Sequence, residues 1–283
     1  MSFGSDGFRF RRWEAAPSWP QAQASIDSSW HQALQQGEVI KDEAETLLLR
    51  SPLPDSRMAW WKLYRVPPRW RWRSFGARSR ALREWRALRA FYAAGVPVVK
   101  PLAFGEDRRW GSLQASLLVT EEATQTTDLR QRLVRESPSS LERARWLRAA
   151  GKAVRHMHDT GFGHFRLQLR NLLGREGITD AEAEILFLDL PYACAFPRTA
   201  NDRVRCMDLI DLAGSHSGLE AEDVRILLQA YAGSGTSPLE VGTLLAESRW
   251  RQKIRRITTY LFYVNTGHRP LPPPWNACPE SWS

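Results

Sequence analysis

The pattern of hydrophobic and polar positions divides the chain into a strand-rich first part and a helix-rich second part. Short apolar segments bounded by turn residues predict five strands, over 37–41, 45–50, 58–64, 98–104 and 116–120. The first two strands are expected to join at Asp42 and Glu43. Residues 1–36 show no clean period, and we expect an extension there with a short helix around 22–35.

Helical periodicity dominates the second part of the chain. Apolar residues three and four positions apart predict further helices over 141–158, 203–212, 220–231 and 238–263. Two short segments, 167–173 and 184–188, are expected to form a hairpin after the first of these helices. The tail from Arg269 contains five prolines and is expected to be extended and irregular. Together these elements indicate an α+β protein.

A helix predicted over 79–93, ended by Gly95-Val96-Pro97, carries one acidic residue on an apolar and basic surface. Its apolar face is expected to hold Ala81, Trp85, Leu88 and Tyr92, with Phe91 beside them. Glu84 lies at the edge of this face, and an unpaired buried carboxylate is costly. Lys62, on a neighbouring predicted strand, is the natural partner. The alternative is a surface ion pair with Arg80 or Arg83, which contributes little to stability.

The positive charge of the chain is concentrated in one stretch. The formal net charge is +9, and residues 57–90 contain eleven Lys or Arg and a single acid. The same stretch holds Trp60, Trp61, Trp70, Trp72 and Trp85. This mixture suits an anionic membrane surface or a phosphorylated glycolipid, because indole rings settle at the headgroup level while guanidinium groups pair with phosphate. Nucleic acid is a less favoured partner, and a solvated basic face without a partner remains the other interpretation.

The cysteine and histidine residues give no indication of a structural metal site. Cys194, Cys206 and Cys278 lack metal-ligand spacing and cannot all pair with one another, so we expect a reduced, cytoplasmic protein. His156 and His158 lie on different sides of a predicted helix, which disfavours zinc. No apolar run approaches the roughly 18 residues that a membrane-spanning helix requires.

The candidate chemistry lies in a segment before and after the predicted hairpin. Its spacing resembles the catalytic loop of the protein-kinase-like fold, H-R-D-L-x-x-x-N, followed by a strand and a metal-binding Asp. His164 takes the place of the His, Asn171 that of the Asn, and Asp189 that of the later Asp. The Asp that accepts the substrate hydroxyl proton is replaced by Arg166. An arginine cannot take this proton, because its pKa stays above about 12.

The order and spacing of several segments resemble the lipopolysaccharide core kinases, the Kdo/WaaP-type family of the kinase-like fold. The matching segments, within roughly residues 37–232, include Gly37-Glu38-Val39, Trp61-Lys62-Leu63-Tyr64-Arg65, Gly95-Val96-Pro97, Phe187-Leu188-Asp189-Leu190 and Arg205-Cys206-Met207-Asp208-Leu209. The resemblance implies a two-lobed α+β protein with a small antiparallel β-sheet N-lobe and a helical C-lobe. The expected boundaries are an extension over 1–36, the N-lobe over 37–122, the C-lobe over 123–268 and a Pro-rich tail over 269–283.

The resemblance also implies a role for individual residues. Lys62 would hold the nucleotide phosphates and Glu84 would hold Lys62, while Glu121 lies where the nucleotide-binding hinge is expected. Asn171 and Asp189 would bind Mg²⁺. Enzymes of this family transfer the γ-phosphate of ATP to a sugar hydroxyl of the lipopolysaccharide inner core, on the cytoplasmic face of the inner membrane. The resemblance therefore implies ATP and Mg²⁺ as cofactors and a location in the cytoplasm or on that membrane face.

Arg166 alters the expected activity, because losing a general base typically costs about 10²–10⁴ in rate. We therefore expect a catalytically impaired pseudokinase, acting through nucleotide binding, scaffolding or regulation of an active kinase of the same pathway. His164 is expected to brace the loop and Asp208 to hold its backbone. The alternative is an active kinase for an inner-core sugar, in which Arg166 stabilises the transferred group. A third interpretation, of another class, is a basic Trp-rich module that binds anionic lipid or nucleic acid.

Overall fold

The computed structural model describes two compact units. The described residues are 8–20, 25–136, 138–177, 183–200, 202–214 and 217–233. The first unit contains the described residues up to Arg89 together with Val99–Ala123. The second contains Ala90–Val98 and the described residues from Thr124 onward. Helix α2 (Arg80–Ala93) contributes its first turns to the first unit and its last turn to the second.

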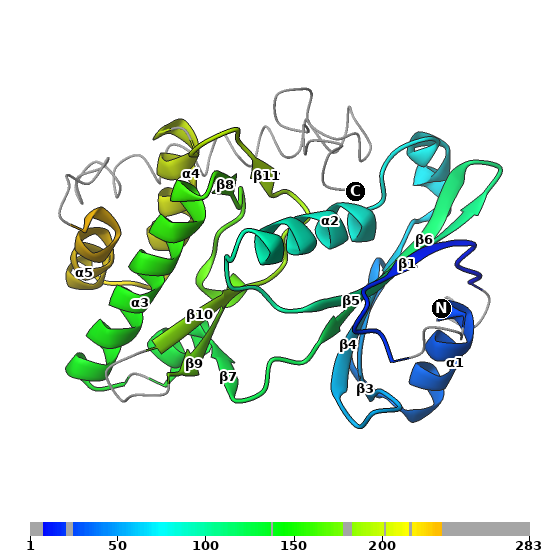
Figure 1. Cartoon of the computed structure of the whole chain (residues 1–283), viewed down its shortest axis with the longest axis horizontal. Coiled ribbons are helices and arrows are strands. Elements are labelled where there is room, and N and C mark those ends of the chain that lie inside the picture. The colour runs from blue at the N-terminus through cyan, green and yellow to red at the C-terminus, as the bar shows by residue number, and fades with distance from the viewer. Residues whose placement is uncertain are drawn as a thin grey trace. The chain divides into compact units, whose positions relative to one another are not determined.

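The first unit is built on a six-stranded antiparallel sheet with the strand order β1-β5-β6-β4-β3-β2 (Figure 1). Its strands are β1 (Arg12–Ala15), β2 (Glu38–Glu43), β3 (Thr46–Pro52), β4 (Met58–Arg65), β5 (Pro101–Arg109) and β6 (Ser112–Glu121). The five predicted strands are confirmed, although β5 begins and ends later than expected. Strand β1 was missed, because its four residues are mostly exposed and show no alternation.

The residues that precede β2 contribute to the core of the first unit. Helix α1 (Ile26–Gln36), which confirms the predicted helix, begins after Ser25, whose hydroxyl accepts a hydrogen bond from the backbone of Ser28. Four buried aromatic rings join this segment to the sheet, namely Phe10, Trp19, Trp30 and Trp61. Fully burying one large apolar side chain contributes about 1.5–3 kcal/mol. These rings therefore anchor residues 8–20 and 25–36 on β3 and β4.

The connection between β2 and β3 lies later than the sequence indicated. We expected the turn at Asp42 and Glu43, but β2 continues through Glu43 and the turn is at Ala44 and Glu45. The Asp42 carboxylate accepts a hydrogen bond of 2.7 Å from Arg65 of β4. An exposed edge strand gives a weak sequence signal, because all six of its side chains face solvent.

Helix α2 has the predicted apolar face, with one correction. Ala81, Trp85, Leu88 and Phe91 are buried, but Tyr92 is 61% exposed. Phe91 takes the buried position in the last turn, and Tyr92 lies about 100° further around the helix. The helix ends where Gly95 adopts a positive φ of 74° and the amide of Val96 donates to the carbonyl of Phe91. This is the glycine helix terminus that the sequence predicted.

Each unit also contains shorter elements. A 3-10 helix, η2 (Pro68–Ser74), follows β4 in the first unit. The second unit contains strands β7 (Thr126–Asp128), β8 (Phe162–Gly163), β9 (Leu172–Glu176), β10 (Ala183–Phe187) and β11 (Cys194–Ala195), a π-helical turn η3 (Gln131–Arg135) and a 3-10 turn η4 (Leu169–Asn171). The strands form a sheet of order β10-β9-β7 and a β11-β8 pair. The predicted hairpin is β9–β10, which begins later than expected, just after Asn171.

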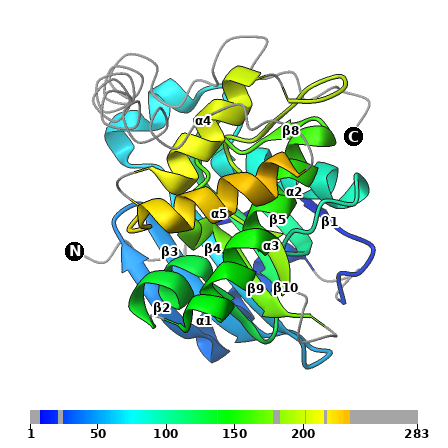
Figure 2. The same cartoon turned by 90° about the vertical axis from the view of Figure 1, so that its left-hand side faces the viewer.

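Three helices form the body of the second unit, α3 (Ser140–Asp159), α4 (Asp202–Ala213) and α5 (Ala221–Ala232). They confirm three of the predicted helices, while the helix predicted over 238–263 and the tail from Arg269 lie outside the described residues. Helix α5 packs along α3 (Figure 2), where a Cβ on Gly151 would lie 2.5 Å from the carbonyl oxygen of Leu227. Among the helices that the structure describes, none combines the length and apolar character needed to cross a membrane.

A partly buried ion pair joins α3 to the start of α5. Arg143 donates two hydrogen bonds of 2.6 Å to the carboxylate of Asp223. Asp223 also accepts from the backbone amide of Glu220, which completes a capping box at the N-terminus of α5. Burial favours the neutral form of Asp223, but the hydrogen bonds from Arg143 and Glu220 outweigh burial and lower its pKa.

Replacing Asp223 by Asn should weaken the second unit in a pH-dependent way. We expect Asp223→Asn to cost about 1–3 kcal/mol at neutral pH, because it leaves the Arg143 charge partly buried and unpaired. A carboxylate with a depressed pKa contributes stability above its unfolded pKa of about 3.9 and loses that contribution as pH falls through the folded value. The difference between wild type and variant should therefore shrink below about pH 4.

Urea unfolding at a series of pH values measures this difference. Glu222→Gln is the matched control, because Glu222 is 61% exposed and pairs with an exposed arginine, Arg225. The control should unfold like wild type. Equal stability of Asp223→Asn and the control at neutral pH would contradict the assigned role.

Candidate functional site

The loop between β8 and η4 is held by one buried carboxylate. One oxygen of Asp208, on α4, accepts the backbone amide of Phe165 at 2.7 Å, and the other accepts that of His164 at 2.7 Å. The second oxygen also lies 3.2 Å from Nε2 of His158. Asp208 has no exposed surface, so these contacts replace its hydration. The expectation that Asp208 holds the backbone of this loop is confirmed.

A polar network behind the loop engages Asp159, the acidic residue closest to Arg166 along the sequence. Nδ1 of His158 is 2.9 Å from the hydroxyl of Tyr231, which also accepts from Arg205. Arg205 and Arg155 both donate to Asp159. Burial favours the neutral form of Asp159, but these two guanidinium groups outweigh burial and lower its pKa. Asp159 is thus an ionised partner of two arginines, which makes it a poor proton acceptor.

Hydrogen bonds bring three of the candidate residues together within the second unit. The side-chain amide of Asn171 donates to the carbonyl of Arg166 at 2.9 Å. The backbone carbonyl of Asn171 accepts the amide of Leu188 at 3.1 Å. His164 is buried, and its Nε2 lies 3.1 Å from the carbonyl of Leu188, so this nitrogen carries the proton. These two bonds hold Leu188, the residue before Asp189, against Asn171 and His164.

Two residues of this region have strained backbones that the sequence did not reveal. Phe165 and Asp189 have φ values of 62° and 58°, in the left-handed region that side chains other than Gly rarely adopt. Such positions cost about 1–3 kcal/mol each and cluster at functional sites. Phe165 directly precedes Arg166, and Asp189 is itself a candidate metal ligand. The strained positions therefore lie at or next to two of the candidate site residues, Arg166 in the loop and Asp189 after the hairpin.

The side chain of Arg166 stacks on an aromatic ring. Its guanidinium carbon lies 4.4 Å from the ring centroid of Tyr192. A cation–π contact orients the guanidinium but leaves its charge un-neutralised by that partner. The position at which the loop template carries a proton acceptor therefore holds a positive charge.

The first unit contains the expected pair of Lys62 and Glu84. Nζ of Lys62, on β4, is 3.6 Å from a carboxylate oxygen of Glu84, on α2. The other oxygen accepts a hydrogen bond of 2.6 Å from the hydroxyl of Tyr64. Glu84 is only 3% exposed, so this carboxylate does face inward as its place on the helix suggested. The sequence did not identify Tyr64 as a member of this group.

Glu121 lies at the end of β6, and its side chain is engaged by neighbouring cations. Its carboxylate is 2.5 Å from Arg57 and 3.3 Å from Lys100. Its backbone amide donates to the carbonyl of Lys100. A role for Glu121 in holding a nucleotide stays a prediction, and a contact through its backbone would leave these ion pairs intact.

Replacing Asp208 by Asn tests whether this carboxylate holds the loop. Asn keeps the shape but presents an NH₂ group to donors, so at least one of the three contacts is lost. We expect a cost of about 2–4 kcal/mol, because the site is fully buried. Hydrogen exchange should quicken at the amides of His164 and Phe165 by more than elsewhere in the second unit. Uniform acceleration, or none, would contradict this role, and the amide of Leu63 in the first unit is an internal control.

Comparison with known proteins identifies the family to which the chain is similar. Residues 58–231 match the lipopolysaccharide kinase (Kdo/WaaP) family. Over 88 residues the chain is 35% identical to the lipopolysaccharide core heptose(I) kinase WaaP of Pseudomonas aeruginosa, covering 30% of this chain and 32% of that protein. The match thus spans about a third of the length of this curated relative.

The structural comparison agrees with the mixed architecture described above. The solved structure of WaaP in complex with acyl carrier protein has a TM-score of 0.58 and 21% sequence identity, over 89% of this chain and 99% of that chain. At this identity the likeness shows a shared α+β fold, with an antiparallel sheet and helices. The family match covers more than half of the sequence printed above. The chain therefore belongs to the lipopolysaccharide kinase (Kdo/WaaP) family.

Proposed function

We propose that this protein binds ATP with Mg²⁺ but transfers phosphate poorly, as a pseudokinase of the lipopolysaccharide kinase family. One observation carries the proposal. The loop around His164 is held by Asp208, yet it presents Arg166 where the loop template has a proton acceptor. A loop whose backbone contacts are kept and in which one residue is changed differs from a catalytic site that has lost most of its residues.

The pair of Lys62 and Glu84 supports nucleotide binding. In kinases a lysine on a strand contacts the phosphates, and a glutamate on a helix positions that lysine. Lys62 has a side chain that is 24% exposed, whereas that of Glu84 is 4% exposed. The lysine therefore reaches solvent, where a phosphate can approach, and its partner is held from behind by Tyr64.

Asn171 and Asp189 fit the modest needs of a Mg²⁺ ion bound with a nucleotide. Mg²⁺ usually takes one or two protein oxygens and completes its shell with water and phosphate. Within the described residues no group of three or more His, Cys, Asp or Glu gathers as a metal site. Asn171 and Asp189 supply a carbonyl and a carboxylate oxygen on adjoining segments, which suits an ion that arrives with ATP. Bound Mg²⁺ would neutralise phosphate charge.

Arg166 is the reason to expect slow transfer. Its guanidinium cannot accept the proton of an acceptor hydroxyl, and Asp159 is already paired with two arginines.

We therefore propose that the protein regulates or scaffolds an active kinase in lipopolysaccharide core biosynthesis, at the cytoplasmic face of the inner membrane. The partner named in the solved relative makes acyl carrier protein a further candidate partner. The N-lobe would span 37–122, with β1 and α1 packed onto it, and the C-lobe would span 123–268.

An active kinase is the second candidate, and the contact between Arg166 and Tyr192 favours it. The ring holds the guanidinium without neutralising it. A positive charge positioned in this way could stabilise the charge of a phosphoryl group in transfer, since phosphoryl transfer depends mainly on positioning and electrostatics.

Phosphate incorporation into lipopolysaccharide core oligosaccharide separates the two candidates. Under the pseudokinase proposal, Arg166→Asp restores a proton acceptor and should raise the rate by about 10²–10⁴ over a slow wild type. Adding Asp189→Ala to this variant should abolish the gain. Wild-type turnover at about 1–100 s⁻¹, abolished by Asp189→Ala, would contradict the pseudokinase proposal and support the active kinase.

A further inference from the structure

Three large aromatic side chains of the first unit are exposed on two adjoining segments, η2 with the residue after it and the β5–β6 turn. Trp72 lies on η2 and is 68% exposed, Phe75 follows η2 and is 69% exposed, and Trp110 lies between β5 and β6 and is 97% exposed. The ring of Phe75 covers Gly111, because a Cβ on that glycine would lie 2.6 Å from it. The η2 segment and the β5–β6 turn are therefore in contact. We call these three residues, with the arginines around them, the aromatic patch.

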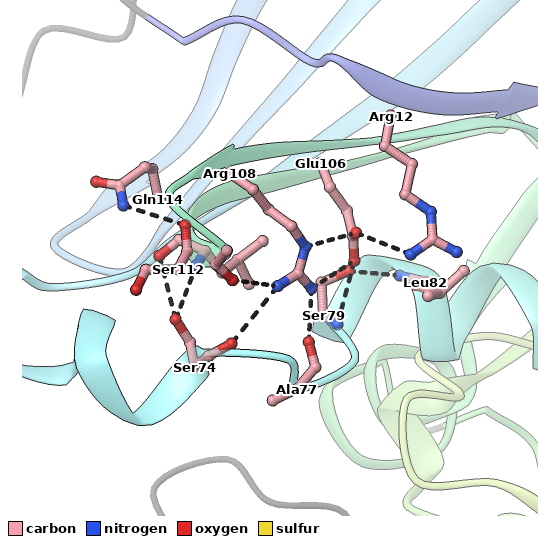
Figure 3. A network of polar contacts seen from close by, with 11 residues as sticks. Arg12, Ser74, Ala77, Ser79, Leu82, Glu106, Arg108, Ser112 and Gln114 are labelled. Atoms are coloured by element: carbon pink, nitrogen blue, oxygen red, sulfur yellow. Dashed lines mark hydrogen bonds and ion pairs between the residues drawn. The ribbon is translucent and has the colours of Figure 1, made fainter.

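A network of hydrogen bonds fixes the η2 segment to the β5–β6 hairpin (Figure 3). Arg108 donates to the carbonyl of Ala77 at 2.5 Å and to that of Gly111 at 3.0 Å. Its guanidinium is held in turn by the buried carboxylate of Glu106, at 2.9 Å. The hydroxyl of Ser74 accepts the amide of Leu113 at 2.9 Å. The aromatic patch thus stands on a rigid base, although it lies outside the regular elements of the sheet.

Trp110 is exposed at a backbone position that does not suit it. Trp110 and Gly111 have φ values of 51° and 80°, and they form the two-residue connection between β5 and β6. A turn with two positive φ values favours Asn, Asp or Gly. A tryptophan there carries backbone strain and exposes almost its whole indole to water. Neither cost helps the fold, so the residue is better explained by a partner.

The two chain segments that carry the aromatic patch are rich in arginine. Residues 66–83 contain six arginines and no acidic residue, and residues 108–115 add two arginines and no acid. Arg108 is committed to Glu106, whereas Arg69, Arg78 and Arg109 are exposed. Such a surface attracts a partner with dense negative charge.

We propose that the aromatic patch is the surface by which this protein lies on an anionic lipid bilayer. Trp72, Phe75 and Trp110 would enter the headgroup region, which Trp prefers, while the arginines pair with lipid phosphates. This names the contact for the membrane location given under the proposed function, and it depends on that function only for the membrane being the relevant partner. The proposal does not require ATP or phosphoryl transfer.

The contacts of the patch favour a bilayer over nucleic acid. Single-stranded nucleic acid binds by stacking its bases on open aromatic faces. Arg73 already lies over the ring of Trp72 at 4.9 Å and over that of Trp70 at 4.7 Å. Trp110 lies at the tip of a turn, where its indole can enter the headgroup region of a bilayer. An acidic protein would match the charge, but charge alone does not explain three exposed aromatic side chains.

Co-sedimentation of the full chain with vesicles, without nucleotide, tests the proposal. The vesicles are phosphatidylcholine alone or phosphatidylcholine mixed with phosphatidylglycerol. We expect binding to the anionic vesicles only, weakening as salt is raised. Trp110→Asn should lower the partition coefficient about tenfold, because the indole no longer enters the interface. Arg78→Gln and Arg109→Gln should each lower it about fivefold.

The variants are chosen so that misfolding cannot mimic the expected result. Asn suits a positive φ, so Trp110→Asn should unfold at the same denaturant concentration as wild type or a higher one. Leu141→Asn and Arg148→Gln, at exposed positions on α3, are matched controls and should bind vesicles like wild type.

Two results would overturn the proposal. One is equal binding to both kinds of vesicle. The other is a Trp110→Asn variant that binds anionic vesicles as well as the Leu141→Asn control does. This result would overturn the proposal even if Trp110 proved necessary for binding RNA or an acidic protein. Because vesicle binding is measured without ATP, its failure is distinguishable from failure of the phosphotransfer proposal.

Discussion

The buried carboxylate of Asp208 is the constraint on which the candidate site depends. It holds the backbone of His164 and Phe165, and it contacts His158 from the neighbouring helix. Without these acceptors one buried and one partly buried amide would lack partners, and the positive φ of Phe165 would have little to maintain it. Arg166 thus follows a backbone that Asp208 holds in place, and under the proposed function its side chain is what would slow the chemistry.

A second buried carboxylate has a comparable role in the first unit. Glu106 binds Arg108 and accepts the amide of Ser79, whose hydroxyl in turn accepts the amide of Leu82 at the start of α2. Burial favours the neutral form of Glu106, but the hydrogen bonds of Arg108 and Ser79 outweigh burial and lower its pKa. This one group therefore fixes both the aromatic patch and the beginning of the helix that carries Glu84.

The sequence was sufficient for the elements that have a strong period or a clear stop signal. It located α2 and its glycine terminus, the long helix α3, and the inward carboxylate Glu84 with Lys62 as its partner. It also located Asp208, because the segment Arg205-Cys206-Met207-Asp208-Leu209 matches the family in order and spacing. These features are local, or they follow from a carboxylate that needs a partner.

Features that depend on contacts between distant segments were beyond the sequence. The basic Trp-rich stretch over 57–90 was treated as one surface, but Trp61 and Trp85 are buried, and Trp110 from another hairpin joins the exposed aromatic residues instead. The left-handed backbones of Phe165 and Asp189 likewise left no pattern, because a strained residue is held by its surroundings and not by its own propensity.

The central claim is that a nucleotide site persists although the proton acceptor has been replaced. A calorimetric titration of the wild-type protein with ATP, in the presence and absence of Mg²⁺, tests it most directly. The account predicts binding that requires Mg²⁺ and is lost when Asp189 is changed to Ala. Absence of binding under both conditions, or binding indifferent to Mg²⁺ and to Asp189, would contradict it.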